Sequence, residues 1–188
     1  MSTFYRFLCF AVVLVSFSLL VSALPSPRTD NAWLIASNDP LCTCINEFMA
    51  KAKACIDVIA GCRDPITLKA NIAVFVALCN AHAAQLLTIG AAVKVTAESQ
   101  ASIVACYAAM ITLLIQTCIN LTVKLGVAVV VTACVGLDAA IVLVLKNLDI
   151  CIKGVVVLIV NTCKNAVVGG FPQLNFNLCA NLFVTVGA

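Results

Sequence analysis

Apolar residues recur at helical spacing after residue 39. Between residues 45 and 59 they stand at i, i+3, i+4 and i+7, and polar residues fall largely on the opposite side. Asp-Pro pairs at 39–40 and 64–65 precede two such runs. Aspartate is a favourable N-cap, and proline suits the first helical position. The pattern therefore predicts amphipathic helices within 39–97.

A duplication marks the more apolar second half of the chain. The segments 106–120 and 151–165, offset by 45 residues, share two cysteines, a leucine, a threonine and an asparagine at matching positions. A further cysteine follows at the same offset in each copy. We therefore expect two related helical hairpins, at 98–142 and 143–187. Valine and isoleucine would also suit strands, but the period-2 alternation of a half-buried strand is missing.

Breaks between the apolar runs give the expected order of elements. Lysine in the last turn and glycine just after it favour a helix end, and breaks of this kind fall at 124–126, 146–149 and 169–172. The sequence predicts an all-α fold, a bundle of about six helices in a single domain over 39–188. The expected helices are roughly 40–60, 65–88, 99–123, 127–146, 149–168 and 173–185.

The N-terminal residues predict passage through the secretory route. A basic residue, an apolar run over 7–20 and a Val-Ser-Ala site at 21–23 are typical of a signal peptide, expected over 1–23. A membrane anchor is the alternative, because the apolar run is only slightly short of a span. The polar, proline-containing residues 24–38 are expected to form a flexible arm.

Cysteine content indicates a disulfide framework. One of the 12 cysteines lies in the predicted signal peptide, which leaves 11, an odd number, for an oxidising compartment. Cys118 and Cys134 stand eight residues either side of Gly126, and in an antiparallel hairpin turning there they face each other. Cys163 and Cys179 are placed in the same way about the second turn. We predict that these two disulfides staple the bundle.

Composition and charge exclude several classes of protein. With 63% apolar residues, 10% charged residues and a net charge of +3, the chain is neither disordered nor an ordinary cytosolic domain. Its basic residues are scattered, so no nucleic-acid partner is expected.

No catalytic constellation, cofactor site or metal site is predicted, and the protein is not expected to be an enzyme. The spacing Cys42-Thr43-Cys44 could suggest a metal, but the chain has one histidine, His82, which we expect to be a satisfied or partly exposed side chain. Asp138, alone in an apolar run, is expected to pair with a lysine such as Lys146, or to be a buried acid in a ligand cavity. Asn120 lies in an N-glycosylation sequon and is a candidate glycan site.

The functional prediction rests on the expected excess of exposed apolar surface. A domain of this size buries only about 60–70% of its surface, so contiguous apolar surface should stay exposed as an interaction site. We expect that surface in the duplicated half, where charges are fewest. From residue 100 onward the charged residues are Lys124, Asp138, Lys146, Asp149, Lys153 and Lys164.

The expected protein is secreted, cysteine-rich and non-catalytic. Its partner would be a lipid-like apolar ligand, a lipid surface or another apolar interface, or a second copy of the chain. The alternative is an integral membrane protein of the secretory pathway with about four transmembrane helices, because residues 99–123 contain no charge. Lysines at turns on alternating sides, and the lack of a Trp or Tyr belt, favour secretion.

Overall fold

Eight α-helices and one short 3₁₀-helix form the part of the chain that this computed structural model describes, residues 33–37, 39–92 and 94–186. No strand occurs within those ranges, which confirms the predicted all-α class. The predicted signal peptide at 1–23 and most of the predicted arm at 24–38 lie outside the described residues.

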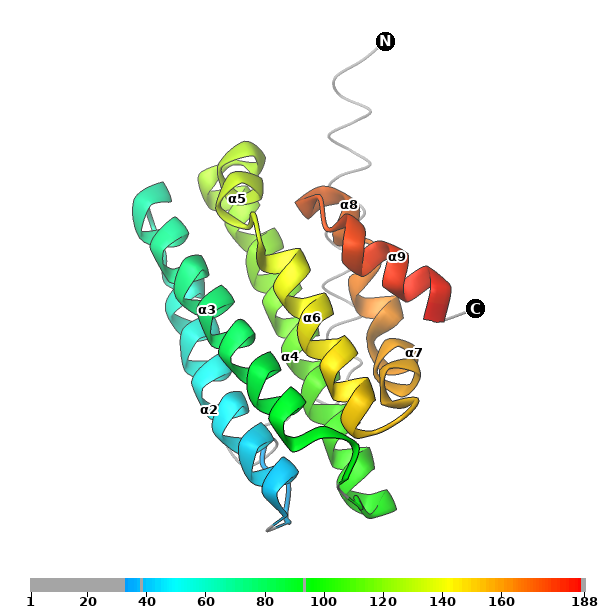
Figure 1. Cartoon of the computed structure of the whole chain (residues 1–188). Coiled ribbons are helices and arrows are strands. Elements are labelled where there is room, and N and C mark those ends of the chain that lie inside the picture. The colour runs from blue at the N-terminus through cyan, green and yellow to red at the C-terminus, as the bar shows by residue number, and fades with distance from the viewer. Residues whose placement is uncertain (1–32, 38, 93, 187–188) are drawn as a thin grey trace. The chain divides into compact units, whose positions relative to one another are not determined.

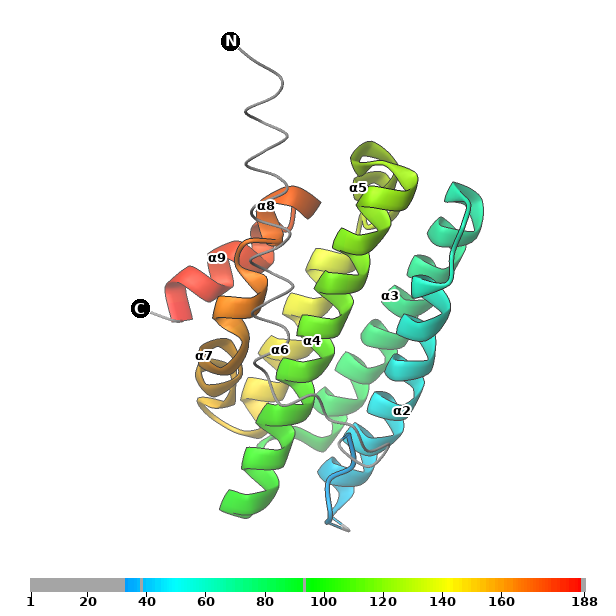
Figure 2. The ribbon, with the colours of Figure 1, turned by 180° about the vertical axis from the view of Figure 1, so that it is seen from behind.

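Four longer helices, α2, α3, α4 and α6, lie side by side, and α7 and α9 pack against them (Figures 1 and 2). Helix α2 packs against both α3 and α4. The most extensive contact of α3 is with α6, and that of α4 is with α7. The elements are α2 (Pro40–Ala60), α3 (Pro65–Ile89), the 3₁₀-helix η1 (Gly90–Ala92), α4 (Ala97–Leu125), α5 (Val127–Ala133), α6 (Leu137–Cys151), α7 (Val155–Val167), α8 (Phe171–Leu174) and α9 (Asn177–Val186).

The first two helices begin where the Asp-Pro pairs predict. The Asp39 carboxylate accepts a hydrogen bond from the Cys42 backbone N–H at 2.8 Å, and Asp64 accepts one from the Thr67 N–H at 2.8 Å. Each bond satisfies one of the N–H groups that a helix leaves unpaired at its start. Hydrogen bonds from the Thr67 side chain and backbone also lower the pKa of Asp64.

One predicted break, at 146–149, is wrong, because α6 continues through it to Cys151. Lys146 is exposed there, but it lies within the helix and not at a turn. Asn147 is buried and donates a hydrogen bond to the Ala83 carbonyl of α3 at 2.9 Å. The Asp149 carboxylate accepts hydrogen bonds from the backbone N–H groups of Gly154 and Val156. It therefore caps the start of α7, which follows the turn that the structure has after α6.

The predicted helix over 127–146 is divided into α5 and α6, which are bent by 47° relative to each other. Gly136 lies between them with φ +89°, a left-handed conformation that favours glycine. The predicted helix over 173–185 is likewise divided, into the short α8 and α9. These two divisions account for the difference between the six expected helices and the eight observed.

The duplicated segments are folded alike over only part of their length. Residues 106–120 lie within the single helix α4, whereas 151–165 span the break between α6 and α7. The helices that carry the two copies, α4 and α7, pack along each other.

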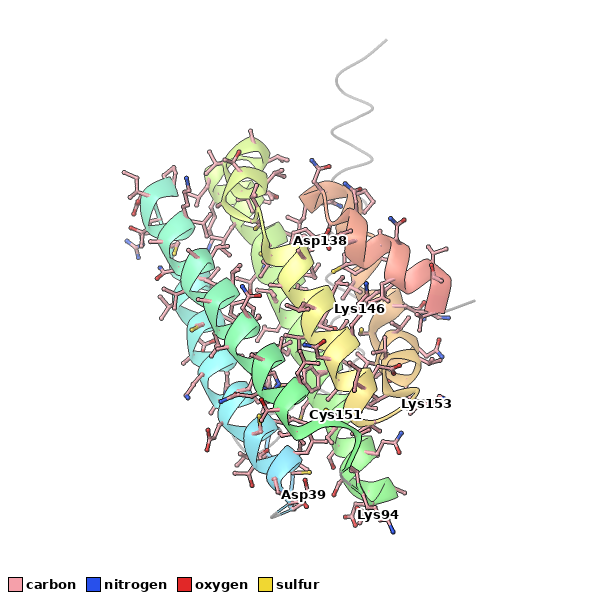
Figure 3. The ribbon with its side chains drawn as sticks, in the orientation of Figure 1. Asp39, Lys94, Asp138, Lys146, Cys151 and Lys153 are labelled. Atoms are coloured by element: carbon pink, nitrogen blue, oxygen red, sulfur yellow. The ribbon has the colours of Figure 1, made fainter. Side chains whose placement is uncertain are left out.

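Asp138 neither pairs with Lys146 nor stands in a ligand cavity, which corrects both expectations for this residue. Its carboxylate accepts hydrogen bonds from the backbone N–H groups of Leu178 at 2.7 Å and Cys179 at 2.8 Å, in the first turn of α9. Lys146 lies further along α6 (Figure 3). An aspartate of α6 therefore caps a helix that begins about 40 residues later in the chain.

Replacing Asp138 with alanine is expected to lower the free energy of unfolding by about 2 kcal/mol, because two backbone N–H groups lose a charged acceptor. Asp57→Ala is the matched control: Asp57 is exposed in the last turn of α2, so its loss should change stability by less than about 0.5 kcal/mol. Urea unfolding of the two variants measures the difference. Equal stabilities would contradict the capping role.

Candidate functional site

Helix α3 has an inner and an outer face that are both apolar. Its inner face is buried against α2 and α6 through residues such as Leu68, Ile72 and Phe75. The helix has a mean hydropathy of 1.8 over its most apolar stretch, yet only 33% of that stretch is buried. The prediction of an amphipathic helix is therefore right for α2 and wrong for α3.

The outer face of α3 carries a largely apolar stripe on the solvent side of the bundle, which it shares with the exposed Lys69 and Asn80. Three large side chains on it are exposed, Ile66 by 83%, Val74 by 57% and Leu87 by 53%. Alanines fill the positions between them. At the helical rise of 1.5 Å per residue the stripe is about 30 Å long. Its members are Ile66, Ala70, Ala73, Val74, Ala77, Ala81, Ala84 and Leu87, all of them exposed.

A shallow, open depression of about 490 Å³ lies at the start of this stripe. Its lining is almost entirely apolar, and Lys69, which is the only charged residue of α3, stands at its edge. The depression is lined by Pro65, Ile66, Lys69, Ala70 and Ala73.

Exposed apolar residues also occur in the duplicated half, in shorter stretches that include lysines. On α6 the exposed Leu143 and Ile150 have Lys146 between them on the same face. On α7 the exposed Val157 and Val168 are separated by Lys164. The expectation that the partner surface lies after residue 98 stays a prediction, but the longer exposed apolar face is on α3.

Two of the described helices, α3 and α4, are long and apolar enough to cross a membrane. The bent pair α5 and α6 would make a third span if it counted as one. In α4, 56% of the most apolar stretch is buried within the bundle.

A second feature is a polar cluster, here called the His82 cluster, of Cys44, Phe48, His82, Gln85 and Tyr107. His82 is 1% exposed, and its Nε2 lies 2.6 Å from the Tyr107 hydroxyl oxygen. Its Nδ1 lies 3.6 Å from Cys44 Sγ, which is also 3.7 Å from Gln85 Oε1. The Phe48 ring stacks on the imidazole with centroids 4.0 Å apart and planes 3° apart.

One set of proton positions gives every donor in this cluster an acceptor. Tyr107 is fully buried, and a buried hydroxyl needs a partner. If its O–H donates to His82 Nε2, then Nδ1–H donates to Cys44 Sγ and the thiol donates to Gln85 Oε1. His82 is thus a satisfied core histidine, one of the two expected states.

The electrostatics of the cluster do not activate Cys44 as a nucleophile. Burial lowers the pKa of His82 to about 4. Burial, and to a lesser extent the Glu47 carboxylate and Cys151, raise the pKa of the Cys44 thiol. Proton transfer from the thiol to the imidazole is therefore strongly uphill, and the neutral pair is the resting state.

The two predicted disulfide pairs make different contacts. Cys118 Sγ and Cys134 Sγ are 3.8 Å apart in the protein interior. Cys163 and Cys179 instead donate their thiols to the carbonyls of Ile159 and Asp138. No disulfide bond joins any of the cysteines in the described part of the chain.

The candidate glycan site lies at the surface. Asn120 is exposed near the end of α4, and Thr122 of the same sequon donates its hydroxyl to the Ile119 carbonyl at 2.7 Å. Within the described residues, no three or more His, Cys, Asp or Glu side chains gather as a metal site would require.

No protein-family model matches the chain, nor does any curated protein or any solved structure. Its function is therefore inferred from its own residues.

Proposed function

We propose that the protein is a secreted, non-catalytic protein that binds lipid surfaces and lipid-like ligands through the outer face of α3. The observation that carries this proposal is the long, exposed stripe of mainly apolar side chains on that helix. Contiguous exposed apolar surface is typical of an interaction site.

The size of the apolar contact is sufficient for reversible association with a lipid surface. Burying the exposed parts of Ile66, Val74 and Leu87 would contribute about 4 kcal/mol, at the usual value for large aliphatic side chains. The alanines between them let the helix backbone approach the surface closely. Lys69 at the edge of the stripe can keep its ammonium group in water while its stem lies on apolar surface.

The absence of an activated nucleophile in the His82 cluster supports a non-catalytic role. The neutral imidazole and the protonated thiol serve packing and hydrogen bonding between α2, α3 and α4. The predicted signal peptide over 1–23 supports secretion.

Flotation with lipid vesicles tests the proposal. The double variant Ile66→Glu/Val74→Glu should lower vesicle binding by on the order of 100-fold, because it removes about 3 kcal/mol of apolar burial and adds charge. Val135→Glu/Val184→Glu is the matched control, since these valines are 77% and 73% exposed and are not part of α3.

Equal loss of binding in both double variants would contradict a site on α3. Concentration-dependent association of the wild type without vesicles, abolished by the α3 variant, would show that the stripe instead binds a second copy.

A disulfide between Cys118 and Cys134 is expected to form in the secreted protein, since their sulfurs lie 3.8 Å apart between α4 and the end of α5. Peptide mapping without reduction should recover the two cysteines in one cross-linked species. Pairing of Cys118 with any residue outside 130–138 would contradict the hairpin geometry. The Cys163–Cys179 bond remains a second prediction for the same map.

The alternative function, an integral membrane protein, is favoured by the length and hydropathy of α3 and α4. Two or three spans, rather than about four, would then be available among the described helices. Carbonate extraction separates the two proposals: recovery of the protein only in the resistant pellet would favour membrane integration, and recovery in the culture supernatant would favour secretion.

A further inference from the structure

The stretch of chain that contains α3 carries positive charge only. Between Asp64, which caps α3, and Glu98, in the first turn of α4, the sequence has no aspartate or glutamate. Its charged residues there are Lys69 and Lys94, and both are exposed. His82 in the same stretch is neutral at pH 7, because burial lowers its pKa to about 4. The region of the apolar stripe therefore has a net charge of +2.

The two lysines lie near opposite ends of α3. Lys69 stands in the second turn of the helix, at the edge of the apolar depression that Ile66 and Ala70 help to line. Lys94 follows η1, and Figure 3 shows it at the end of the bundle where α4 begins. Within the described residues neither ammonium group forms an ion pair. Both are therefore available to an external anion.

The acid nearest to the stripe opposes this charge only weakly. The Asp64 carboxylate accepts hydrogen bonds from the backbone N–H and the hydroxyl of Thr67 at 2.8 and 2.6 Å. Arg63 precedes Asp64 in the chain and offsets its negative charge. A negatively charged surface that approaches the outer face of α3 therefore meets mainly the two lysines.

Anionic phospholipids have the group that complements this face. A membrane that contains them has a negative surface potential, which attracts lysines near the surface. A lysine beside an apolar contact can lay its stem on acyl chains and keep its ammonium group among the phosphates. The apolar stripe and the two charges then act on the same partner.

We propose that the outer face of α3 binds membranes that contain anionic phospholipids in preference to neutral ones, with Lys69 and Lys94 facing the lipid phosphates. This inference rests on the proposed binding of lipid surfaces by α3 and adds the class of lipid. Charge attraction acts over about 10 Å at 0.1 M salt and over a shorter range at higher salt. The preference should therefore fall as salt is raised, whereas the apolar contact persists.

Flotation of the full chain with two kinds of vesicle tests the proposal, one of phosphatidylcholine and one of phosphatidylcholine mixed with phosphatidylglycerol. At low salt we expect binding to the mixed vesicles to be tighter by on the order of tenfold. Lys69→Gln/Lys94→Gln should remove most of this preference and leave binding to phosphatidylcholine unchanged. Lys146→Gln/Lys153→Gln should keep the preference, since it lowers the net charge equally but outside α3 (Figure 3).

All four lysines are exposed, so none of these substitutions should disturb the fold, which urea unfolding checks. Equal binding of the wild type to both vesicles, or equal loss of preference in the two lysine variants, would overturn the selectivity. In those cases, vesicle binding that still depends on Ile66 and Val74 would leave the proposed function in place. Binding to neither kind of vesicle would overturn both.

Discussion

Acidification from pH 7 to pH 4 should lower the free energy of unfolding by about 3 kcal/mol through His82 alone. The buried imidazole has its pKa lowered from 6.5 to about 4 by burial, whereas the unfolded chain binds the proton near 6.5. Between these values the unfolded state binds more protons, so stability falls as the pH falls. Each unit of difference is equivalent to about 1.4 kcal/mol.

The sign and the pH window are specific to this residue. The stabilisation by neutral His82 is fully present above about pH 7 and is lost progressively toward pH 4. Asp64, whose pKa is lowered, adds losses only at more acidic pH. Urea unfolding at pH 7, 5.5 and 4.5 measures the effect. His82→Gln, which can still accept from Tyr107, should lose little stability over this window; a loss equal to that of the wild type would exclude His82 as the source.

Tyr107→Ala is expected to cost about 4 kcal/mol, the largest effect of a single substitution considered for this protein. The side chain is fully buried between α2, α3 and α4, so its truncation leaves a large cavity and removes the partner of His82 Nε2. Since native domains are stable by only about 5–15 kcal/mol, the variant will be close to unfolding.

Tyr107→Phe measures the contribution of the hydroxyl to stability separately from that of the ring. It keeps the packing and removes only the 2.6 Å hydrogen bond, so it should cost about 1–2 kcal/mol. Val123→Ala is the control on the same helix, because Val123 is 67% exposed and its truncation should be nearly neutral. Denaturant unfolding gives the order of the three variants; a Tyr107→Ala protein as stable as Val123→Ala would contradict the cluster's role in the core.

The sequence predicts helix starts well where the cap is local. Asp39 and Asp64 each bond a backbone N–H three residues ahead, so a short motif contains all the information. Asp138 performs the same chemistry on α9, but across about 40 residues, and no local pattern reveals it. The prediction of a break at 146–149 is wrong for a related reason. Asn147 is buried against α3, and this contact between distant parts of the chain is not visible in the local sequence.

The sequence places Cys118 and Cys134 at equal distances from an expected turn at Gly126. Gly126 does end α4, and the two sulfur atoms lie near each other in the structure. The same argument is weaker for Cys163 and Cys179, since α8 lengthens the connection between their helices. The His82 cluster lies beyond sequence reasoning, because Cys44, His82 and Tyr107 come from three helices and meet only through packing.

The composition shows that the chain has an excess of apolar residues, but it does not show which helix leaves them exposed. Sequence reasoning places the partner surface in the duplicated half, where charges are fewest. Packing buries more than half of the most apolar stretch of α4 and leaves two thirds of that of α3 uncovered. A helix that is apolar on all sides needs a second partner wherever the bundle leaves it at the surface.

Photo-cross-linking with a diazirine-bearing phospholipid in vesicles tests the central claim most directly. Trypsin cuts after Lys69 and Lys94, so one peptide, 70–94, contains most of the outer face of α3. The account predicts that lipid adducts concentrate on this peptide and are lost in Ile66→Glu/Val74→Glu. Adducts spread evenly over the peptides of α4, α6 and α7, or unchanged in the α3 variant, would contradict it.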